Sequence, residues 1–187
     1  MSTNSLANSI VVLGDSISAA YGIPYDKGWV NLLQKKPLLQ SKNYTVINES
    51  ISGDTTAGGL TRIKQILRQH QPNIVLLELG ANDGLRGFPP ALIKKNLTEL
   101  IHRSQQSGAI VMLLGMRIPP NYGKRYADLF YNIYLELAKE PDVYFVPFIM
   151  DGVVLVPEMM QDDGLHPNTK AQPIIADKIW TYLTPLL

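Results

Sequence analysis

Short apolar runs alternate with longer segments of helical periodicity along the whole chain. Five runs have the length and composition of strands: residues 9–14, 44–48, 73–79, 109–114 and 143–146. Between and after them, the sequence predicts helices at residues 27–36, 57–70, 90–106, 124–139 and 169–184. This order is typical of βαβ units, whose parallel strands form a sheet with helices on both faces. We therefore predict an α/β fold of three layers, α/β/α, around a five-stranded parallel sheet.

Proline and glycine mark several of these boundaries. Pro72 follows the second predicted helix, Pro89 and Pro90 begin the third, and Gly108 ends it. A chain of 187 residues has the size of one ordinary domain, and the sequence contains no internal repeat or linker. We predict a single domain over residues 1–187.

The composition excludes several classes of protein. A formal net charge of +1 gives no electrostatic reason to expect a nucleic-acid partner. No apolar run approaches the roughly 18 residues that cross a bilayer, so we expect no stable membrane insertion. Without cysteine, the chain has neither a disulfide nor a thiolate nucleophile. Residues 1–8 are polar and do not have the pattern of a secretory signal.

The segment Gly14-Asp15-Ser16-Ile17-Ser18 follows the first predicted strand directly. The Ser16 hydroxyl is therefore expected at the carboxyl edge of the sheet, where open α/β folds bind ligands. Free N–H groups in such a turn also favour developing negative charge. Helix capping by Asp15 and Ser16 explains the segment equally well. A nucleophilic role for Ser16 therefore depends on finding its partners.

Asp163 precedes His166 by three residues, a spacing that places both side chains on one face of a helical turn. The carboxylate can then accept the Nδ1 proton of His166, so that Nε2 is free to take a proton from Ser16. His70 and His102 fall within predicted helices without such a partner, and we interpret them as structural or surface residues. The sequence predicts a triad of Ser16, Asp163 and His166.

Acyl transfer through a serine also requires hydrogen-bond donors for the oxyanion of the tetrahedral intermediate. Gly53 lies after the second predicted strand, and Asn82 lies after the third. Each residue alone is typical of an ordinary turn. Polar loops at the carboxyl ends of three successive strands favour a shared site, in which the Gly53 N–H and the Asn82 amide face the oxyanion.

These segments together resemble the four blocks of the SGNH hydrolase superfamily, also called GDSL hydrolases. The Ser, Gly, Asn and His of that name fall on Ser16, Gly53, Asn82 and His166. Four further stretches resemble the bacterial multifunctional acyl-CoA thioesterase/protease/lysophospholipase/arylesterase group: SISGDTTAGGL, LELGANDGLRGF, PPNYGKRY and QDDGLHPN. The similarity extends over residues 10–185.

The resemblance implies a flavodoxin-like SGNH hydrolase fold and a serine hydrolase. Its implied substrates are carboxylic esters and acyl thioesters, such as acyl-CoA, lysophospholipids and aryl esters, cleaved through an acyl-enzyme on Ser16. In that group the Ser N–H, the Gly N–H and the Asn amide form the oxyanion hole, which places it here at Ser16, Gly53 and Asn82. We expect no cofactor and no metal, since one local cluster around His166 lacks a second histidine. Members are usually exported, so we expect a periplasmic location, with a cytoplasmic one as the alternative.

The chain departs from the family pattern at two positions. Ile17 and Ala81 stand where the name motif has leucine and where many members have a second glycine. Neither change removes a catalytic atom. They put the substrate range in question, and leave the chemistry unaltered.

Two loop-rich segments, residues 115–123 and 147–168, are long enough to bind a substrate. Within them, we predict that the acyl chain of a small-molecule ester or thioester contacts four residues: Ile118, Pro119, Tyr122 and Leu155. Ordinary packing over the sheet edge is the alternative for each. We expect the protein to act as a monomer.

Two other functions compete with this prediction. A carbohydrate acetyl esterase would use the same four blocks with a small, polar acyl pocket. A non-catalytic flavodoxin-like binding module would hold a phosphate at its first loop. That loop lacks the G-x-G-x-x-G fingerprint, and the module leaves the Asp163/His166 pair unexplained.

Overall fold

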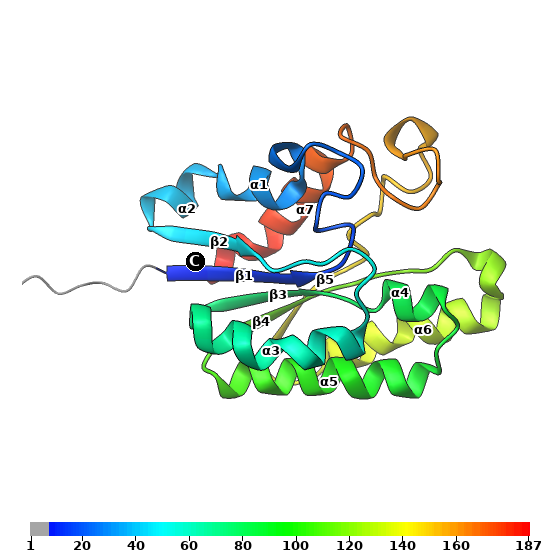
Figure 1. The fold of residues 1–187 in the computed structure, drawn as a ribbon, viewed down its shortest axis with the longest axis horizontal. Coiled ribbons are helices and arrows are strands. Elements are labelled where there is room, and N and C mark those ends of the chain that lie inside the picture. The colour runs from blue at the N-terminus through cyan, green and yellow to red at the C-terminus, as the bar shows by residue number, and fades with distance from the viewer. Residues whose placement is uncertain (1–7) are drawn as a thin grey trace, which may run out of the picture.

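Five parallel strands form the central sheet of the computed structural model, which describes residues 8–187. Residues 1–7, which form most of the segment inspected for an export signal, lie outside the described residues. The strand order is β2-β1-β3-β4-β5 (Figure 1). The strands are β1 (Asn8–Gly14), β2 (Tyr44–Asn48), β3 (Ile74–Glu78), β4 (Ile110–Leu114) and β5 (Val143–Val146). The predicted α/β fold with a five-stranded parallel sheet is confirmed.

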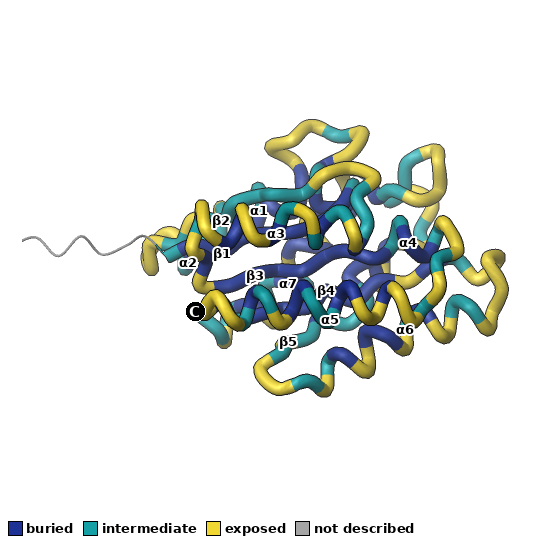
Figure 2. Tube along the Cα trace, turned by 60° about the horizontal axis from the view of Figure 1, so that its bottom comes forward, coloured by how far each residue is buried: buried dark blue, intermediate teal, exposed yellow. Residues whose placement is uncertain are grey.

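The strands are apolar on both faces because helices cover both sides of the sheet. All of β3 is buried, and so is β1 after Asn8. In the register of the sheet, Val11 of β1 lies opposite Val75 on one side and Ile47 on the other. Figure 2 shows these strands as the buried centre of the molecule, with the exposed residues on the outer faces of the helices and on the loops.

Helices α1 and α7 pack together on one face of the sheet, and α3, α5 and α6 lie on the other (Figure 1). The helices are α1 (Trp29–Gln34), α2 (Pro37–Ser41), α3 (Thr56–His70), α4 (Ala81–Leu85), α5 (Pro90–Gln106), α6 (Lys124–Leu137) and α7 (Gln172–Leu183). Short 3-10 helices occur at Tyr25–Lys27, Pro120–Tyr122, Pro157–Met159 and Thr184–Leu186. Within residues 8–187, no helix combines the length and apolarity needed to cross a bilayer.

The helices differ from the prediction most clearly in three places. The helix predicted at 27–36 is shorter, because α2 begins at Pro37, where proline suits a first turn. The last helix begins at Gln172 instead of residue 169, after a turn in which the Asn168 side chain accepts a hydrogen bond from the Lys170 N–H. Helix α4 was not predicted, because its five residues carry too little periodicity to reveal it.

The parallel arrangement places the carboxyl ends of β1, β2 and β3 at one edge of the sheet. Gly14, the last residue of β1, lies opposite Glu78, the last residue of β3. The loops that follow these strands therefore meet at this edge, where the predicted site residues are located.

Candidate active site

The turn after β1 holds Ser16 at the edge of the sheet. Asp15 shapes this turn, because its carboxylate Oδ1 accepts the Ile17 N–H at 3.1 Å and its carbonyl accepts the Ala19 N–H at 2.9 Å. Gly14 is required by packing, since a Cβ atom there would lie 2.7 Å from the Ser18 Oγ atom. Ser16 itself is half-buried, so a ligand can reach its hydroxyl.

His166 joins Ser16 to Asp163 through two hydrogen bonds. Its Nε2 atom lies 2.8 Å from the Ser16 Oγ atom, and its Nδ1 atom lies 2.6 Å from Oδ2 of Asp163. The other carboxylate oxygen of Asp163 accepts the backbone N–H groups of Leu165 at 2.9 Å and His166 at 3.0 Å. A carboxylate can only accept, so Nδ1 carries the proton and Nε2 accepts from the serine hydroxyl. The hydrogen-bond chain expected from the sequence is therefore present.

The environment of Asp163 keeps its side chain ionised. Desolvation raises the pKa of this carboxyl group, but hydrogen bonds from the His166 N–H, the His166 ring and the Leu165 N–H outweigh it and lower the pKa to about 2. Asp163 therefore remains an anion at every pH at which a serine hydrolase is normally assayed. An ionised partner favours the Nδ1 proton on His166 and stabilises an imidazolium that forms during catalysis.

The segment that carries His166 is fastened to the nucleophile side of the sheet. Gln161 donates its backbone N–H to the His166 carbonyl at 2.8 Å, and its side-chain amide donates to the Tyr21 carbonyl at 2.8 Å. The Tyr21 ring lies against the imidazole, with 4.6 Å between the ring centroids. Neither Tyr21 nor Gln161 was predicted as a site residue, although Gln161 begins the stretch QDDGLHPN.

Two backbone N–H groups at this edge are free to bind an anion. Within residues 8–187, neither the Ser16 N–H nor the Gly53 N–H donates to a backbone carbonyl. Gly53 has a φ of +80°, and its Cα faces open space. Its carbonyl accepts a hydrogen bond of 3.1 Å from Arg86, which helps to hold this turn in place. Within the described chain, the expected pair of backbone donors therefore has no backbone acceptor.

Asn82 lies in the first turn of α4 and contacts both neighbouring loops. Its Nδ2 group donates to Oδ2 of Asp15 at 3.1 Å and to the Asp54 carbonyl at 2.9 Å. Both amide hydrogens are thus engaged in the resting site. A ligand oxyanion must share one of them, and the longer bond to Asp15 is the weaker of the two.

The loop before Asn82 depends on a glycine with positive φ. Gly80 has a φ of +118°, and a Cβ atom there would collide with the hydroxyl of Tyr134. That hydroxyl donates to the Leu79 carbonyl at 2.8 Å, so Tyr134 holds the start of this loop in place. The neighbouring Asp83 is buried and accepts the Thr56 N–H at 2.9 Å, which joins α4 to the start of α3.

Two buried carboxyl groups lie beneath the nucleophile turn. Glu78 accepts the Asp15 N–H at 3.1 Å and the Ser18 hydroxyl at 2.6 Å through the same oxygen, Oε2. Burial raises the pKa of Asp15 to about 6, and burial together with the charge of Asp15 raises the pKa of Glu78 well above its usual value. Glu78 was not predicted as a site residue, although a lone acidic residue in the apolar run 73–79 was a usable signal.

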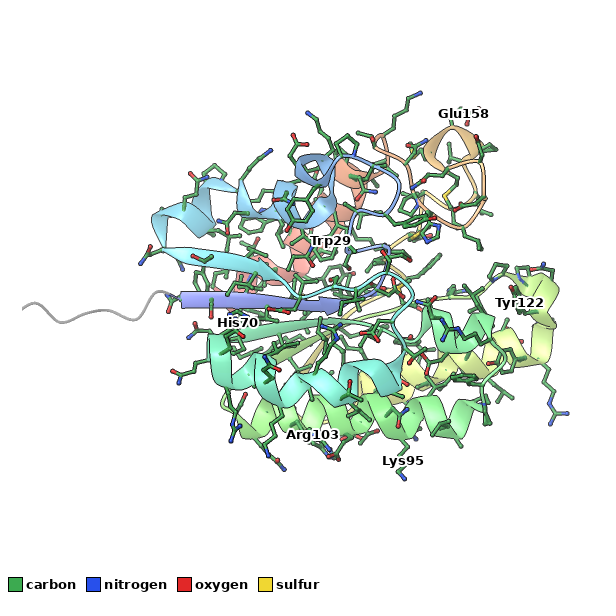
Figure 3. The ribbon with its side chains drawn as sticks, in the orientation of Figure 1. Trp29, His70, Lys95, Arg103, Tyr122 and Glu158 are labelled. Carbon is green, nitrogen blue, oxygen red and sulfur yellow. The ribbon has the colours of Figure 1, made fainter. Side chains whose placement is uncertain are left out.

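The predicted substrate-binding residues have very different surroundings. Ile118 is only 6% exposed and packs beside Gly84, so little of its side chain can meet a ligand. Leu155 is 90% exposed, Tyr122 is 43% exposed and Pro119 is half-buried. Figure 3 shows Tyr122 at the tip of its loop, separated from the loop that carries Glu158. The contact of these four residues with an acyl chain therefore stays a prediction.

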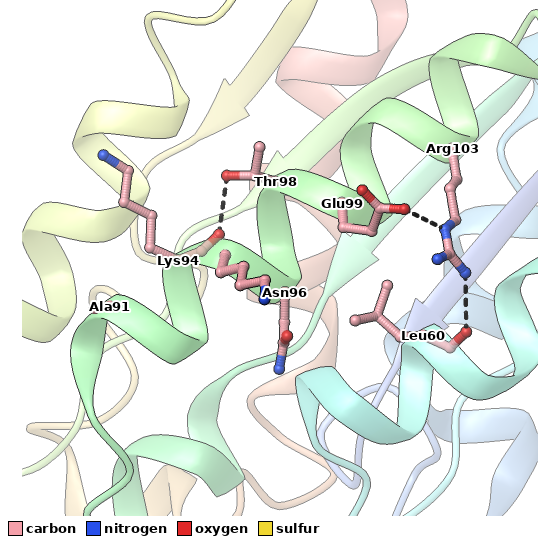
Figure 4. Close-up of a pocket in the computed structure, with 8 residues that line it drawn as sticks. Leu60, Ala91, Lys94, Asn96, Thr98, Glu99 and Arg103 are labelled. Carbon is pink, nitrogen blue, oxygen red and sulfur yellow. Dashed lines mark hydrogen bonds and ion pairs between the residues drawn. The ribbon is translucent and has the colours of Figure 1, made fainter.

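The molecule has grooves elsewhere on its surface. One, of about 670 Å³, lies over α3 and α5 and is lined by Leu60, Asn96 and Arg103 among others (Figure 4). A second, of about 550 Å³, lies near β5 beside His102 and Tyr144. Neither groove contains a residue of the hydrogen-bond chain.

Comparison with known proteins assigns the chain to a family. The model of the GDSL-like Lipase/Acylhydrolase family matches residues 12–173, which include every residue of the hydrogen-bond chain and both predicted oxyanion partners of Ser16. The chain belongs to this family. The resemblance found in the sequence is thereby confirmed.

Individual relatives of this GDSL-type hydrolase cover nearly its whole length. The arylesterase of Vibrio mimicus is 53% identical over 171 residues, which are 91% of this chain and 86% of the relative. Thioesterase 1/protease 1/lysophospholipase L1 of Escherichia coli K12 is 48% identical over 181 residues, which are 97% of this chain and 86% of the relative.

A solved structure of this family is also similar in fold. The psychrotrophic esterase EstA from Pseudoalteromonas sp., inhibited by monoethylphosphonate, superposes with a TM-score of 0.90 and 42% identity. The match covers 96% of this chain and 98% of that chain. Family membership favours a GDSL-type hydrolase over the non-catalytic binding module that the sequence left open.

Proposed function

We propose that this GDSL-type hydrolase cleaves carboxylic esters and acyl thioesters through an acyl-enzyme on Ser16. One observation carries the proposal: the continuous hydrogen bonds from Asp163 through His166 to the Ser16 hydroxyl, of 2.6 and 2.8 Å. A serine hydroxyl is a weak nucleophile unless an adjacent base removes its proton as it attacks. The chain provides such a base in the required tautomer.

The geometry supports a reaction in two stages. The Ser16 oxygen bonds to the acyl carbon while its proton moves to Nε2 of His166, and the imidazolium then protonates the alkoxide or thiolate as the carbonyl re-forms. Water next attacks the acyl-enzyme and gives its proton to His166. That proton returns to Ser16 as the carboxylic acid leaves. Asp163 holds the imidazole throughout and stays ionised.

The negative charge on the tetrahedral oxygen is proposed to be stabilised by three donors. The Ser16 N–H and the Gly53 N–H are free of backbone carbonyl acceptors in the described chain, and the Asn82 amide can share the hydrogen that it gives to Asp15. Donors fixed before the reaction lower the barrier without reorganising during it. This part of the site requires neither a metal nor an organic cofactor.

The proposed substrates are small molecules that carry an acyl chain on oxygen or sulfur. The relatives support this range, because one is an arylesterase and another is a thioesterase and lysophospholipase. We further propose that the protein is a monomer and, from the exported character of the group that it resembles, that it acts in the periplasm. Light scattering tests the first proposal, and cell fractionation tests the second.

The decisive assay compares the wild type with Ser16→Ala on p-nitrophenyl esters of increasing acyl length and on acyl-CoA thioesters. We expect turnover of medium and long chains, and a loss of several orders of magnitude in kcat for the variant. Ser41→Ala is a matched control, because that exposed hydroxyl only contacts the Leu38 carbonyl. Full activity in Ser16→Ala would contradict the proposal, and turnover of acetyl esters alone would favour a carbohydrate acetyl esterase.

Covalent labelling gives an independent test of the nucleophile. An alkyl fluorophosphonate should transfer its phosphonyl group to the Ser16 oxygen with loss of fluoride, forming a tetrahedral adduct that mass spectrometry locates. Leu155→Ala and Ile118→Ala, assayed on the same ester series, test the predicted acyl contacts. An unchanged chain-length profile would remove that residue from the binding surface.

A further inference from the structure

Glu78 is the last residue of the buried strand β3, and its acidic side chain is completely buried. Its Oε2 atom accepts two hydrogen bonds, from the Asp15 N–H and the Ser18 hydroxyl. Within residues 8–187, its Oε1 atom has no hydrogen-bond donor. A buried carboxylate oxygen without a donor is unfavourable, and a proton on the group removes the charge.

Acidic side chains outnumber basic ones around Glu78. The carboxyl group of Asp15 lies within hydrogen-bonding reach, and the ionisable groups of Asp83 and Tyr134 also face this region. Asp54 and His166 face Asp15 from neighbouring loops. Arg62 lies beside this turn, but its guanidinium pairs with Asp54 at 2.7 Å and otherwise donates to the backbone carbonyls of Glu49 and Gly14. No described cation therefore neutralises Glu78.

We propose that Glu78 is a positioning residue: it is protonated in the resting enzyme, donates its proton in a hydrogen bond to the Asp15 carboxylate, and through Asp15 orients Asn82. The inference rests on the proposed function, in which Asn82 stabilises the oxyanion. Glu78 touches no reacting atom.

Asp15 is the link between Glu78 and the two parts of the site. Its Oδ1 atom accepts the Ile17 N–H at 3.1 Å, which shapes the nucleophile turn, and its Oδ2 atom accepts the Asn82 amide at 3.1 Å. A neutral Glu78 leaves Asp15 as the anion that both donors require. An ionised Glu78 would place two negative charges side by side, and Asp15 would then take up a proton or move away.

The oxyanion hole depends on the hydrogen bond between Asp15 and Asn82. The Asn82 amide must be held ready to share one hydrogen with the developing oxyanion, and the Asp15 carboxylate fixes its direction. Loss of that anchor leaves the amide bound only to the Asp54 carbonyl, at 2.9 Å. Transition-state stabilisation then falls more than substrate binding, so kcat is the sensitive parameter.

The protonation state of Glu78 can be measured without any substrate. Carbon-13 NMR of glutamate carboxyl groups, with Glu78→Gln to assign the resonance, reports whether Glu78 carries a proton in the resting enzyme at pH 7. We expect the chemical shift of a carboxylic acid. The shift of a carboxylate would overturn the proposal, whatever the enzyme's activity.

Kinetic measurements on two variants then distinguish a positioning role of Glu78 from a role in packing alone. In Glu78→Gln, the amide oxygen can accept from Asp15 and Ser18 while the NH₂ group donates to the Asp15 carboxylate, so we expect kcat within about threefold of wild type. Glu78→Leu keeps the side-chain volume but cannot donate, and we expect kcat to fall roughly 10- to 100-fold with little change in KM. Leu76→Ala changes the core on the same strand. We expect it to lower the stability of the protein, while kcat stays unchanged at temperatures where this variant is folded.

The outcomes are distinguishable from failure of the proposed function. Equal losses in Glu78→Gln and Glu78→Leu, with both variants folded by circular dichroism, would refute the positioning role. Activity retained in Ser16→Ala would instead refute the acyl-enzyme on Ser16, while the NMR result for Glu78 would be unaffected.

Discussion

Replacing Asp163 with asparagine isolates the contribution of the carboxylate that holds His166. The amide oxygen of Asn can still accept the backbone N–H groups of Leu165 and His166, at positions now 2.9 and 3.0 Å from the carboxylate. Its NH₂ group, however, faces the Nδ1 atom of His166, which lies 2.6 Å from the present Oδ2. An NH₂ group only donates, so Nδ1 must become the acceptor and the proton must move to Nε2.

The size of the effect follows from this change of tautomer. An Nε2 atom that carries a proton cannot accept one from Ser16, and the imidazolium formed in the reaction loses its counter-ion. We expect kcat to fall by roughly 10³- to 10⁴-fold, which corresponds to about 4 to 5.5 kcal/mol of transition-state stabilisation. Stability should change by less than about 1 kcal/mol, since the Asp163 side chain is 39% exposed and its backbone contacts remain.

The assay is kcat and kcat/KM for a p-nitrophenyl ester over a range of pH, with unfolding in urea as the stability measurement. Asp162→Asn is the matched control, because within the described chain the His166 ring pairs with Asp163 and not with this exposed neighbour. A loss in Asp163→Asn no larger than in Asp162→Asn would refute the reasoning. Since the pKa of Asp163 is about 2, any fall in activity between pH 7 and pH 4 must come from another group.

Two further predictions concern the loops that hold the site. Gly80→Ala should lower the free energy of unfolding by about 2 to 4 kcal/mol, because it adds strain at a φ of +118° and displaces the Tyr134 hydroxyl. Gly108→Ala, at a φ of +90° with open space around it, should cost only the strain, and similar urea midpoints for the two variants would contradict this account. Burial raises the pKa of Asp15 from 3.8 to about 6, so the folded state binds more protons than the unfolded state between these values and stability falls as pH rises. The free energy of unfolding is then lower by about 3 kcal/mol above pH 6 than at low pH. Urea unfolding from pH 4 to pH 7 should show that this free energy falls less steeply in Asp15→Asn.

The sequence determined the sheet and most of the long helices. Strands buried on both faces must be apolar throughout, so each of the five runs could be recognised by itself, as in residues 74–78. The five-residue helices α2 and α4 span little more than one turn each, which is too short to show a periodicity. Helix ends differ from the prediction where a proline fixes the first turn, as at Pro37.

Part of the site could also be predicted from residues that are close together in the sequence. The spacing of Asp163 and His166 gives their contact directly, because three residues of a turn place the two side chains together. The partnership of His166 with Ser16, 150 positions apart in the chain, was inferred from residue types and from a family resemblance. The distance of 2.8 Å between them is a product of the sheet, which brings both loops to one edge.

Only the tertiary structure decided what surrounds each of these groups. The sequence contains Glu78 as a lone acid in an apolar strand, but its place opposite Gly14 and beside Asp15 arises from the pairing of β1 with β3. The tilted contact between the rings of Tyr21 and His166 likewise joins two distant loops. Local patterns record which backbone conformation a segment prefers. The protonation of a buried carboxyl group and the direction of an amide depend on charges and hydrogen bonds through space, which exist only once the chain is folded.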